Sequence, residues 1–139
     1  MGNSRFFSKK ALIVLGILVA VLAIAITGLV QAHPSLRAAE SSPSPGQILS
    51  TAPTQVKLSF NVEDQGLVPD QSYAWVYKEE GLQVVALGKV DLSSAGRNVM
   101  IMALPANLSP GIYIVKWVAV SVVDRGFSEG SYSFAVTGK

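Results

Sequence analysis

The chain contains one histidine, His33, and no cysteine, so a single imidazole is the only strong transition-metal ligand among its nitrogen and sulfur side chains. His33 directly follows Val30-Gln31-Ala32, and the small residues Val30 and Ala32 fit the cleavage site of an export signal. Cleavage after Ala32 would make His33 a new N-terminus. Its free α-amine and its imidazole could then chelate a metal ion such as Cu(II) together. Without cleavage, His33 is an ordinary residue beside a membrane anchor.

Pro34 limits how such a chelate could form. Cu(II) prefers about four nitrogen or oxygen donors in or near one plane. A backbone amide next to an N-terminal amine can lose its proton and become one of these donors. The nitrogen of Pro34 carries no proton, so it cannot compete with the amine and imidazole of His33.

The segment before His33 determines the compartment. Arg5, Lys9 and Lys10 precede an apolar run over residues 11–30. The core of a signal peptide usually covers about 7–15 residues, whereas about 20 apolar residues suffice for a transmembrane helix. Two interpretations of residues 1–32 therefore stay open, a cleaved signal peptide and an N-terminal transmembrane anchor. Both place the rest of the chain outside the cytoplasmic membrane, in a periplasmic or extracellular location, and the second anchors it to that membrane through residues 11–30.

The part of the chain after residue 32 is nearly neutral in charge and has the length of one domain. The three basic residues before Ala11 account for the whole positive surplus, because eight Lys and Arg face nine Asp and Glu from His33 onward. A nucleic-acid-binding protein would need basic residues clustered on one face, so we expect no nucleic-acid partner. Residues 33–139 have the length of a single domain. With no cysteine in the chain, no disulfide can support its fold.

The pattern after the apolar run predicts an all-β domain. Residues 33–53 are rich in proline and polar residues, which indicates an arm and a loop that leads into a β-sandwich over residues 54–139. Apolar and polar residues alternate over 56–62, as in a half-buried strand. Further strands are predicted at 72–78, 82–87, 97–104, 111–121 and 130–137. Six or seven short strands at this spacing are typical of a sandwich with Greek-key connections.

Aromatic residues support this architecture. Leu108-x-Pro110-Gly111-x-Tyr113 places a tyrosine just inside a strand after a tight turn, similar to the tyrosine corner of immunoglobulin-like sandwiches. Tyr113 and Trp117 share one face of their strand, and Tyr132 and Phe134 share one face of theirs. We interpret these rings as core. Met100 and Met102, two positions apart on one strand, are interpreted in the same way.

Several short segments, in order and spacing, resemble the CopC family of exported copper-binding proteins. The matching segments are His33-Pro34-x-Leu36, Ser41-x-Pro43-x-x-Gly46, Ala52-Pro53-Thr54-x-Val56-x-Leu58-x-Phe60, Leu108-x-Pro110-Gly111-x-Tyr113-x-Val115-x-Trp117, Val120-Ser121 leading to Asp124, and Gly130-Ser131-Tyr132-Ser133-Phe134-x-Val136. The resemblance implies an immunoglobulin-like or cupredoxin-like Greek-key β-sandwich. It also implies a role in copper resistance, sequestration or delivery, and a CopD-like membrane protein as partner.

The resemblance implies a Cu(II) site as well, and this chain carries only part of it. In the family the metal is held by the N-terminal histidine, an aspartate, and a second histidine two positions after the aspartate. His33 and Asp124 match the first two positions, and the third is Gly126, which has no side chain to coordinate a metal. Amine, imidazole and carboxylate would supply three donors and water the fourth. We therefore expect an incomplete and more open copper site formed by His33 and Asp124.

Enzyme chemistry is poorly supported. The sequence has no Gly-x-Ser-x-Gly motif, no cysteine nucleophile and no second histidine to act as a base partner. Glu63, Asp64 and Asp70 lie in an acidic loop that is best interpreted as solvated. We expect a protein that is not an enzyme. An alternative remains: a membrane-tethered immunoglobulin-like interaction module whose metal site has decayed, with His33 in a solvated arm.

Overall fold

The structure is a computed structural model of the chain, and it describes residues 33–138. The apolar run over residues 11–30, predicted as a signal peptide or anchor, lies outside the described residues. Among residues 33–138, no helix is long and apolar enough to cross a membrane.

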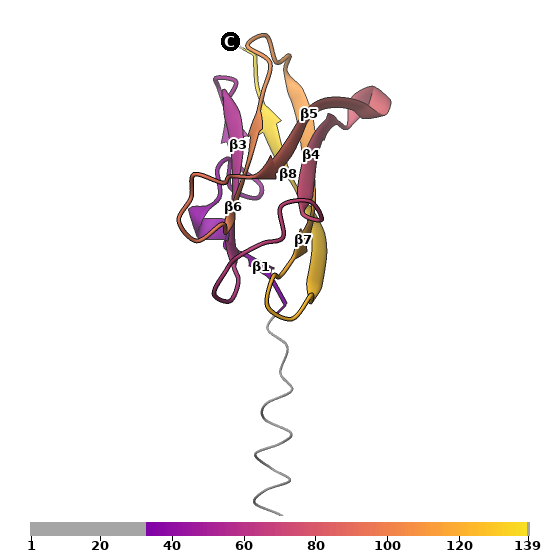
Figure 1. The fold of residues 1–139 in the computed structure, drawn as a ribbon. Helices are drawn as coiled ribbons and strands as arrows, with labels where there is room; N and C mark the ends of the chain where they lie inside the picture. The colour runs from indigo at the N-terminus through magenta and orange to yellow at the C-terminus, as the bar shows by residue number, and fades with distance from the viewer. Residues whose placement is uncertain (1–32, 139) are drawn as a thin grey trace, which may run out of the picture. The chain divides into compact units, whose positions relative to one another are not determined.

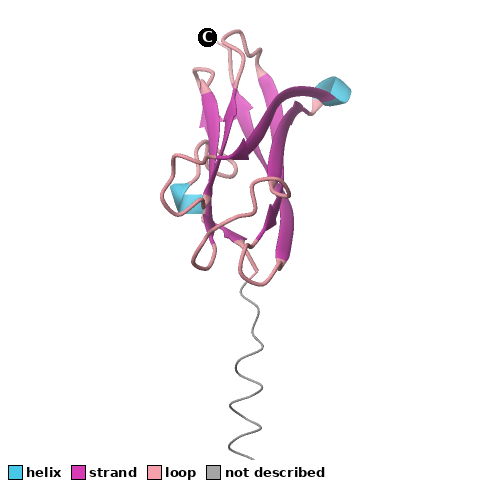
Figure 2. Ribbon diagram, in the orientation of Figure 1, coloured by secondary structure: helices cyan, strands magenta, loops and turns pink. Residues whose placement is uncertain are grey.

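The described residues form a sheet of eight strands that curls around a core (Figures 1 and 2). The strands are β1 (Ser35–Leu36), β2 (Ile48–Leu49), β3 (Gln55–Asn61), β4 (Tyr73–Lys78), β5 (Gln83–Val90), β6 (Val99–Ala103), β7 (Gly111–Val120) and β8 (Phe127–Val136). Their order across the sheet is β1-β3-β6-β5-β4-β7-β8-β2. Two 3₁₀ turns, Ala38–Glu40 and Glu80–Leu82, are the only helical elements in this part of the chain. The prediction of an all-β domain is confirmed.

Strands β3 to β8 are the six strands that the sequence pattern predicted, with ends shifted by a few residues. The arm differs from the expected loop, because it contains β1 and β2. These two short strands lie at opposite ends of the strand order. β1 pairs with β3 in antiparallel fashion, and β2 pairs with β8 in parallel. Strands of two residues among prolines leave no alternating pattern, which is why they could not be predicted.

The core forms where the inward faces of these strands meet. Tyr113 and Phe134 stack with their ring centroids 5.5 Å apart. Met100 and Met102 are fully buried and Trp117 is nearly so, as predicted from their spacing. These side chains are part of a larger buried apolar core, which stabilises the domain.

The tyrosine corner is also present. The Tyr113 hydroxyl donates a hydrogen bond to the backbone carbonyl of Ser109, four residues upstream. The tyrosine is buried, so this bond satisfies a polar group that would otherwise be costly inside the core. It ties the 104–110 connection to the start of β7.

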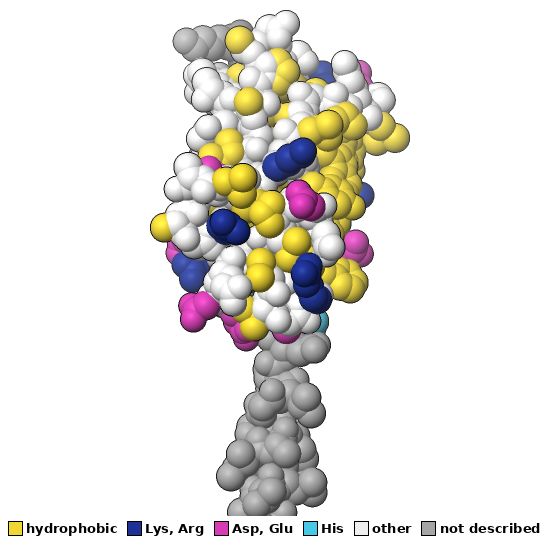
Figure 3. Space-filling model, in the orientation of Figure 1, with side chains coloured by type: hydrophobic (Ala, Val, Ile, Leu, Met, Phe, Trp, Pro, Cys, Tyr) yellow, Lys and Arg dark blue, Asp and Glu magenta, His cyan; other side chains and the backbone are white. Residues whose placement is uncertain are grey.

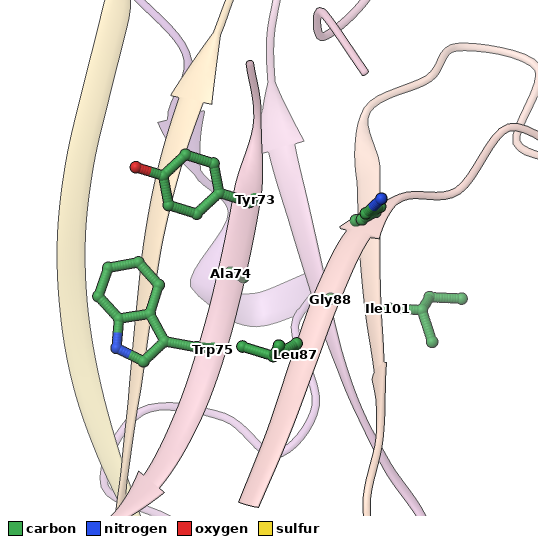
Figure 4. A pocket seen from close by; sticks show the side chains of 7 residues that line it. Tyr73, Ala74, Trp75, Leu87, Gly88 and Ile101 are labelled. Carbon is green, nitrogen blue, oxygen red and sulfur yellow. The ribbon is translucent and has the colours of Figure 1, made fainter. Parts of the chain in front are cut away.

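The outer face of β4 and β5 is unusually apolar. Figure 3 shows hydrophobic side chains gathered over this edge of the domain, while Lys and Arg side chains are scattered among other types. A groove of about 610 Å³ lies there, and Tyr73 and Trp75 stack beside it at 5.9 Å. Figure 4 shows both rings and Leu87 projecting from neighbouring strands. The groove is lined by no histidine, cysteine or carboxylate, so it has no metal-binding character.

Tyr113→Phe should lower the free energy of unfolding by about 1 kcal/mol, because it removes the hydroxyl and leaves the Ser109 carbonyl without its partner. Urea denaturation of the domain measures the change. Tyr77→Phe, on the half-buried outer face of β4, is the matched control and should have little effect. Equal losses in both variants would contradict a stabilising role for the tyrosine corner.

Candidate metal centre

The strand directions bring the arm and the β7–β8 turn to the same end of the domain. Each step from β3 through β6, β5 and β4 to β7 is antiparallel, so β3 and β7 run in the same direction. β7 therefore leads into the turn that holds Asp124 at the end where β3 finishes. The arm pairs with that same end of β3, with Ser35 opposite Asn61. His33, two residues before Ser35, must lie there too.

The arm is fixed by contacts on both sides of Leu36. Pro34 is buried, and the backbone N–H of Arg37 donates to the Ser59 carbonyl at 2.8 Å. The Arg37 guanidinium also donates to Asn61 Oδ1 at 3.2 Å. His33 itself is exposed, so the arm holds its backbone while its side chain stays accessible.

The turn between β7 and β8 holds the carboxylate of Asp124. The Ser121 N–H donates to the Gly126 carbonyl at 2.8 Å and closes the loop. The Gly126 N–H donates to Asp124 Oδ1 at 2.9 Å, a local hydrogen bond of the kind that aspartate commonly forms in turns. Arg125 adopts a left-handed backbone with φ of 59° and its guanidinium donates to Gln71, so it contributes to the shape of the turn.

His33 and Asp124 converge on Gly126. A Cβ atom placed on Gly126 would lie 2.7 Å from His33 Nδ1, and 3.0 and 3.1 Å from Asp124 Oδ2 and Oδ1. The structure thus brings together both candidate ligands and the third position of the expected site. The Oδ2 atom of Asp124 is buried and has no hydrogen-bond partner among the described residues. A buried, unpartnered carboxylate oxygen and an imidazole nitrogen that border the same volume suit a cation.

The surroundings favour the ionised form of Asp124. The Gly126 N–H holds the pKa of the Asp124 carboxyl below its ordinary value of 3.8, and Ser121 and the charge of His33 act in the same direction against the effect of burial. The carboxylate is therefore available at neutral pH, in the form that binds metal ions.

Side chains alone supply too few donors for a copper site. Among residues 33–138, no group of three or more His, Cys, Asp or Glu side chains could hold a metal ion. One imidazole and one carboxylate are present, so a chelate needs a donor from elsewhere. The α-amine of His33 would be that donor if the chain is cleaved after Ala32. The metal role of His33 and Asp124 stays a prediction.

Comparison with known protein families identifies the fold. The CopC domain matches residues 38–137. The chain belongs to the CopC family. The match covers most of the described residues, and it includes the β7–β8 turn that carries Asp124.

Two solved structures are similar to this CopC-family chain. The crystal structure of PcoC, a methionine-rich copper resistance protein from Escherichia coli, is 28% identical in sequence with a TM-score of 0.61. The aligned region covers 76% of this chain and 100% of the PcoC chain. A selenomethionine form of PcoC is 25% identical with a TM-score of 0.58, over 74% of this chain and 99% of the other. No curated protein matches the chain in sequence.

The extent of these matches coincides with one compact unit of the chain. PcoC aligns over its entire length with about three quarters of this chain. The described residues 33–138 form one compact unit with its own core. The domain that begins at His33 can therefore be studied alone.

The lowered pKa of Asp124 predicts how this residue affects stability with pH. Its favourable contribution is fully present above the ordinary pKa of 3.8 and is lost as the pH falls through the lowered folded-state pKa. Asp124→Asn should therefore lower the free energy of unfolding at pH 7. The difference in this free energy between variant and wild type should become smaller below pH 3.8. Urea denaturation across this range measures it. Asp64→Asn, which removes the same charge from another loop, controls for net charge. If the loss of unfolding free energy in Asp124→Asn were the same at every pH, the lowered pKa of Asp124 would be contradicted.

Proposed function

We propose that the domain beginning at His33 binds copper outside the cytoplasmic membrane and serves copper resistance by holding the metal or handing it on. One observation carries the proposal: the convergence of His33 Nδ1 and the Asp124 carboxylate over Gly126. Membership of the CopC family and the similarity to PcoC, a copper resistance protein, support it. Such a role requires binding and release of a metal ion and no catalytic step.

The donor set suits Cu(II). The α-amine and Nδ1 of an N-terminal histidine belong to one residue, so together they close a six-membered chelate ring with the metal. Pro34 keeps the neighbouring amide out of that chelate. The Asp124 carboxylate adds a charged oxygen, and Cu(II) accepts such mixed nitrogen and oxygen sets in a tetragonal arrangement. Water would complete the coordination.

A site with one imidazole has consequences for delivery. Fewer protein donors mean weaker binding and faster exchange than a site with two imidazoles would give. The exposed side of His33 leaves the site open to another protein. We infer a carrier that passes copper to a partner, and a CopD-like membrane protein would be such a partner.

The apolar outer face of β4 and β5 supports a second candidate function. Tyr73 is 49% exposed and Leu87 is 76% exposed, and both border the groove beside Trp75. A membrane-tethered interaction module that binds no copper would use this surface, with the apolar run over residues 11–30 as its anchor. Intact mass of the exported protein separates the two candidates, because the copper site requires loss of residues 1–32 and the tether requires their retention.

Titration of Cu(II) into the domain beginning at His33, followed by calorimetry, tests the copper proposal. We expect one-to-one binding that is lost when the α-amine is acetylated, because acetylation removes one arm of the chelate. Binding that is indifferent to acetylation would contradict the proposed site, and His33 would then be a solvated arm residue.

Asp124→Ala should weaken Cu(II) binding at least about tenfold, because it removes the charged oxygen donor while the amine and imidazole remain. The same titration measures the loss. Asp64→Ala, which removes a carboxylate from the acidic loop, should leave the affinity unchanged. Equal affinities for wild type and Asp124→Ala would exclude Asp124 as a ligand.

A further inference from the structure

We propose that Gly126 is a positioning residue, whose missing side chain lets the imidazole of His33 lie over residue 126, on the volume that the Asp124 carboxylate also borders. For its effect on copper, this inference rests on the proposed function. The position of the ring itself is a property of the metal-free domain.

The argument starts from the space above Gly126. A Cβ atom at this position would lie 2.7 Å from His33 Nδ1, a separation that side-chain carbons essentially never show. Any residue other than glycine would therefore displace the ring. The same Cβ would lie 3.0 Å from Asp124 Oδ2, so the glycine keeps open the volume that both candidate ligands border.

The backbone at residue 126 does not itself require glycine. Gly126 lies outside the left-handed region that Gly46, Gly66, Gly81 and Gly111 occupy. Alanine retains the N–H and carbonyl that make the hydrogen bonds of this residue, and at 3.0 and 3.1 Å from its Cβ the Asp124 carboxylate would have to shift by only a few tenths of an ångström. The glycine is needed for the approach of His33 rather than for the turn.

The displaced group is the far end of an exposed side chain. His33 is exposed, so its ring can rotate away from an added methyl group without disturbing the core. Alanine at position 126 should thus separate the two candidate ligands while the fold stays intact. If the backbone of the turn required glycine, its replacement would instead lower the stability of the domain.

The same geometry bears on the third position of the expected site. A histidine at position 126 would begin at the volume that the His33 ring now borders, so it would require another position of that ring. In this chain the His33 ring lies where a side chain at residue 126 would start. With Gly126 the candidate site has one imidazole, which borders the same volume as the Asp124 carboxylate and is exposed to solvent.

NMR of the metal-free domain beginning at His33 and Cu(II) calorimetry test this inference together. In the wild type, the His33 ring protons should give nuclear Overhauser effects to the Gly126 Hα protons. In Gly126→Ala, the His33 ring resonances should shift and the Cu(II) affinity should fall about 10- to 100-fold, the range expected when a ligand loses its orientation. The thermal midpoint should change by less than about 5 °C.

Val123→Ala is the matched control, because it alters an exposed side chain in the same turn and should change neither the ring resonances nor the affinity. Absence of the ring contact in the wild type, or unchanged ring resonances in Gly126→Ala, would overturn the inference. An unchanged copper affinity in a variant whose ring has moved would also overturn it. If the wild type binds no copper but shows the contact and loses it in the variant, the proposed function fails and the positioning role of Gly126 stands.

Discussion

The antiparallel pairing of β1 with the end of β3 is the interaction on which the candidate site depends. Ser35 and Leu36 lie opposite Asn61 and Phe60, and this register decides where the residues before them lie. A slip of one residue would turn His33 toward the opposite face of the sheet. The burial of Pro34 next to this pairing opposes such a slip. A strand of two residues thus fixes the only histidine of the chain.

A second constraint is local and lies in the β7–β8 turn. The Gly126 N–H holds one oxygen of Asp124, which leaves the other oxygen buried and without a partner among the described residues, beside the same volume over Gly126 that the His33 ring borders. The arm and the turn are far apart in sequence, and the curl of the sheet alone brings them together. The candidate site therefore depends on tertiary structure, since no continuous segment of the sequence carries both His33 and Asp124.

Much of the fold could be predicted from the sequence, because alternation of apolar residues directly reports a half-buried strand. The tyrosine corner at Tyr113 and the buried Met100 and Met102 followed from the same periodicity. The arm strands could not be predicted, since two residues show no period. The sequence showed that Gly126 occupies the position where the family has its second histidine ligand. The approach of the His33 ring to Gly126 could not be predicted, because a contact between residues 93 positions apart leaves no local pattern in the sequence.

The most direct measurement of the central claim is the electron paramagnetic resonance spectrum of Cu(II) bound to the domain beginning at His33. Superhyperfine structure and pulsed methods count the nitrogen donors and identify imidazole. The proposed site predicts two nitrogens, one amine and one imidazole, in a tetragonal environment completed by oxygen. A spectrum with no imidazole nitrogen, or one identical to that of the Asp124→Ala domain, would contradict a site built from His33 and Asp124.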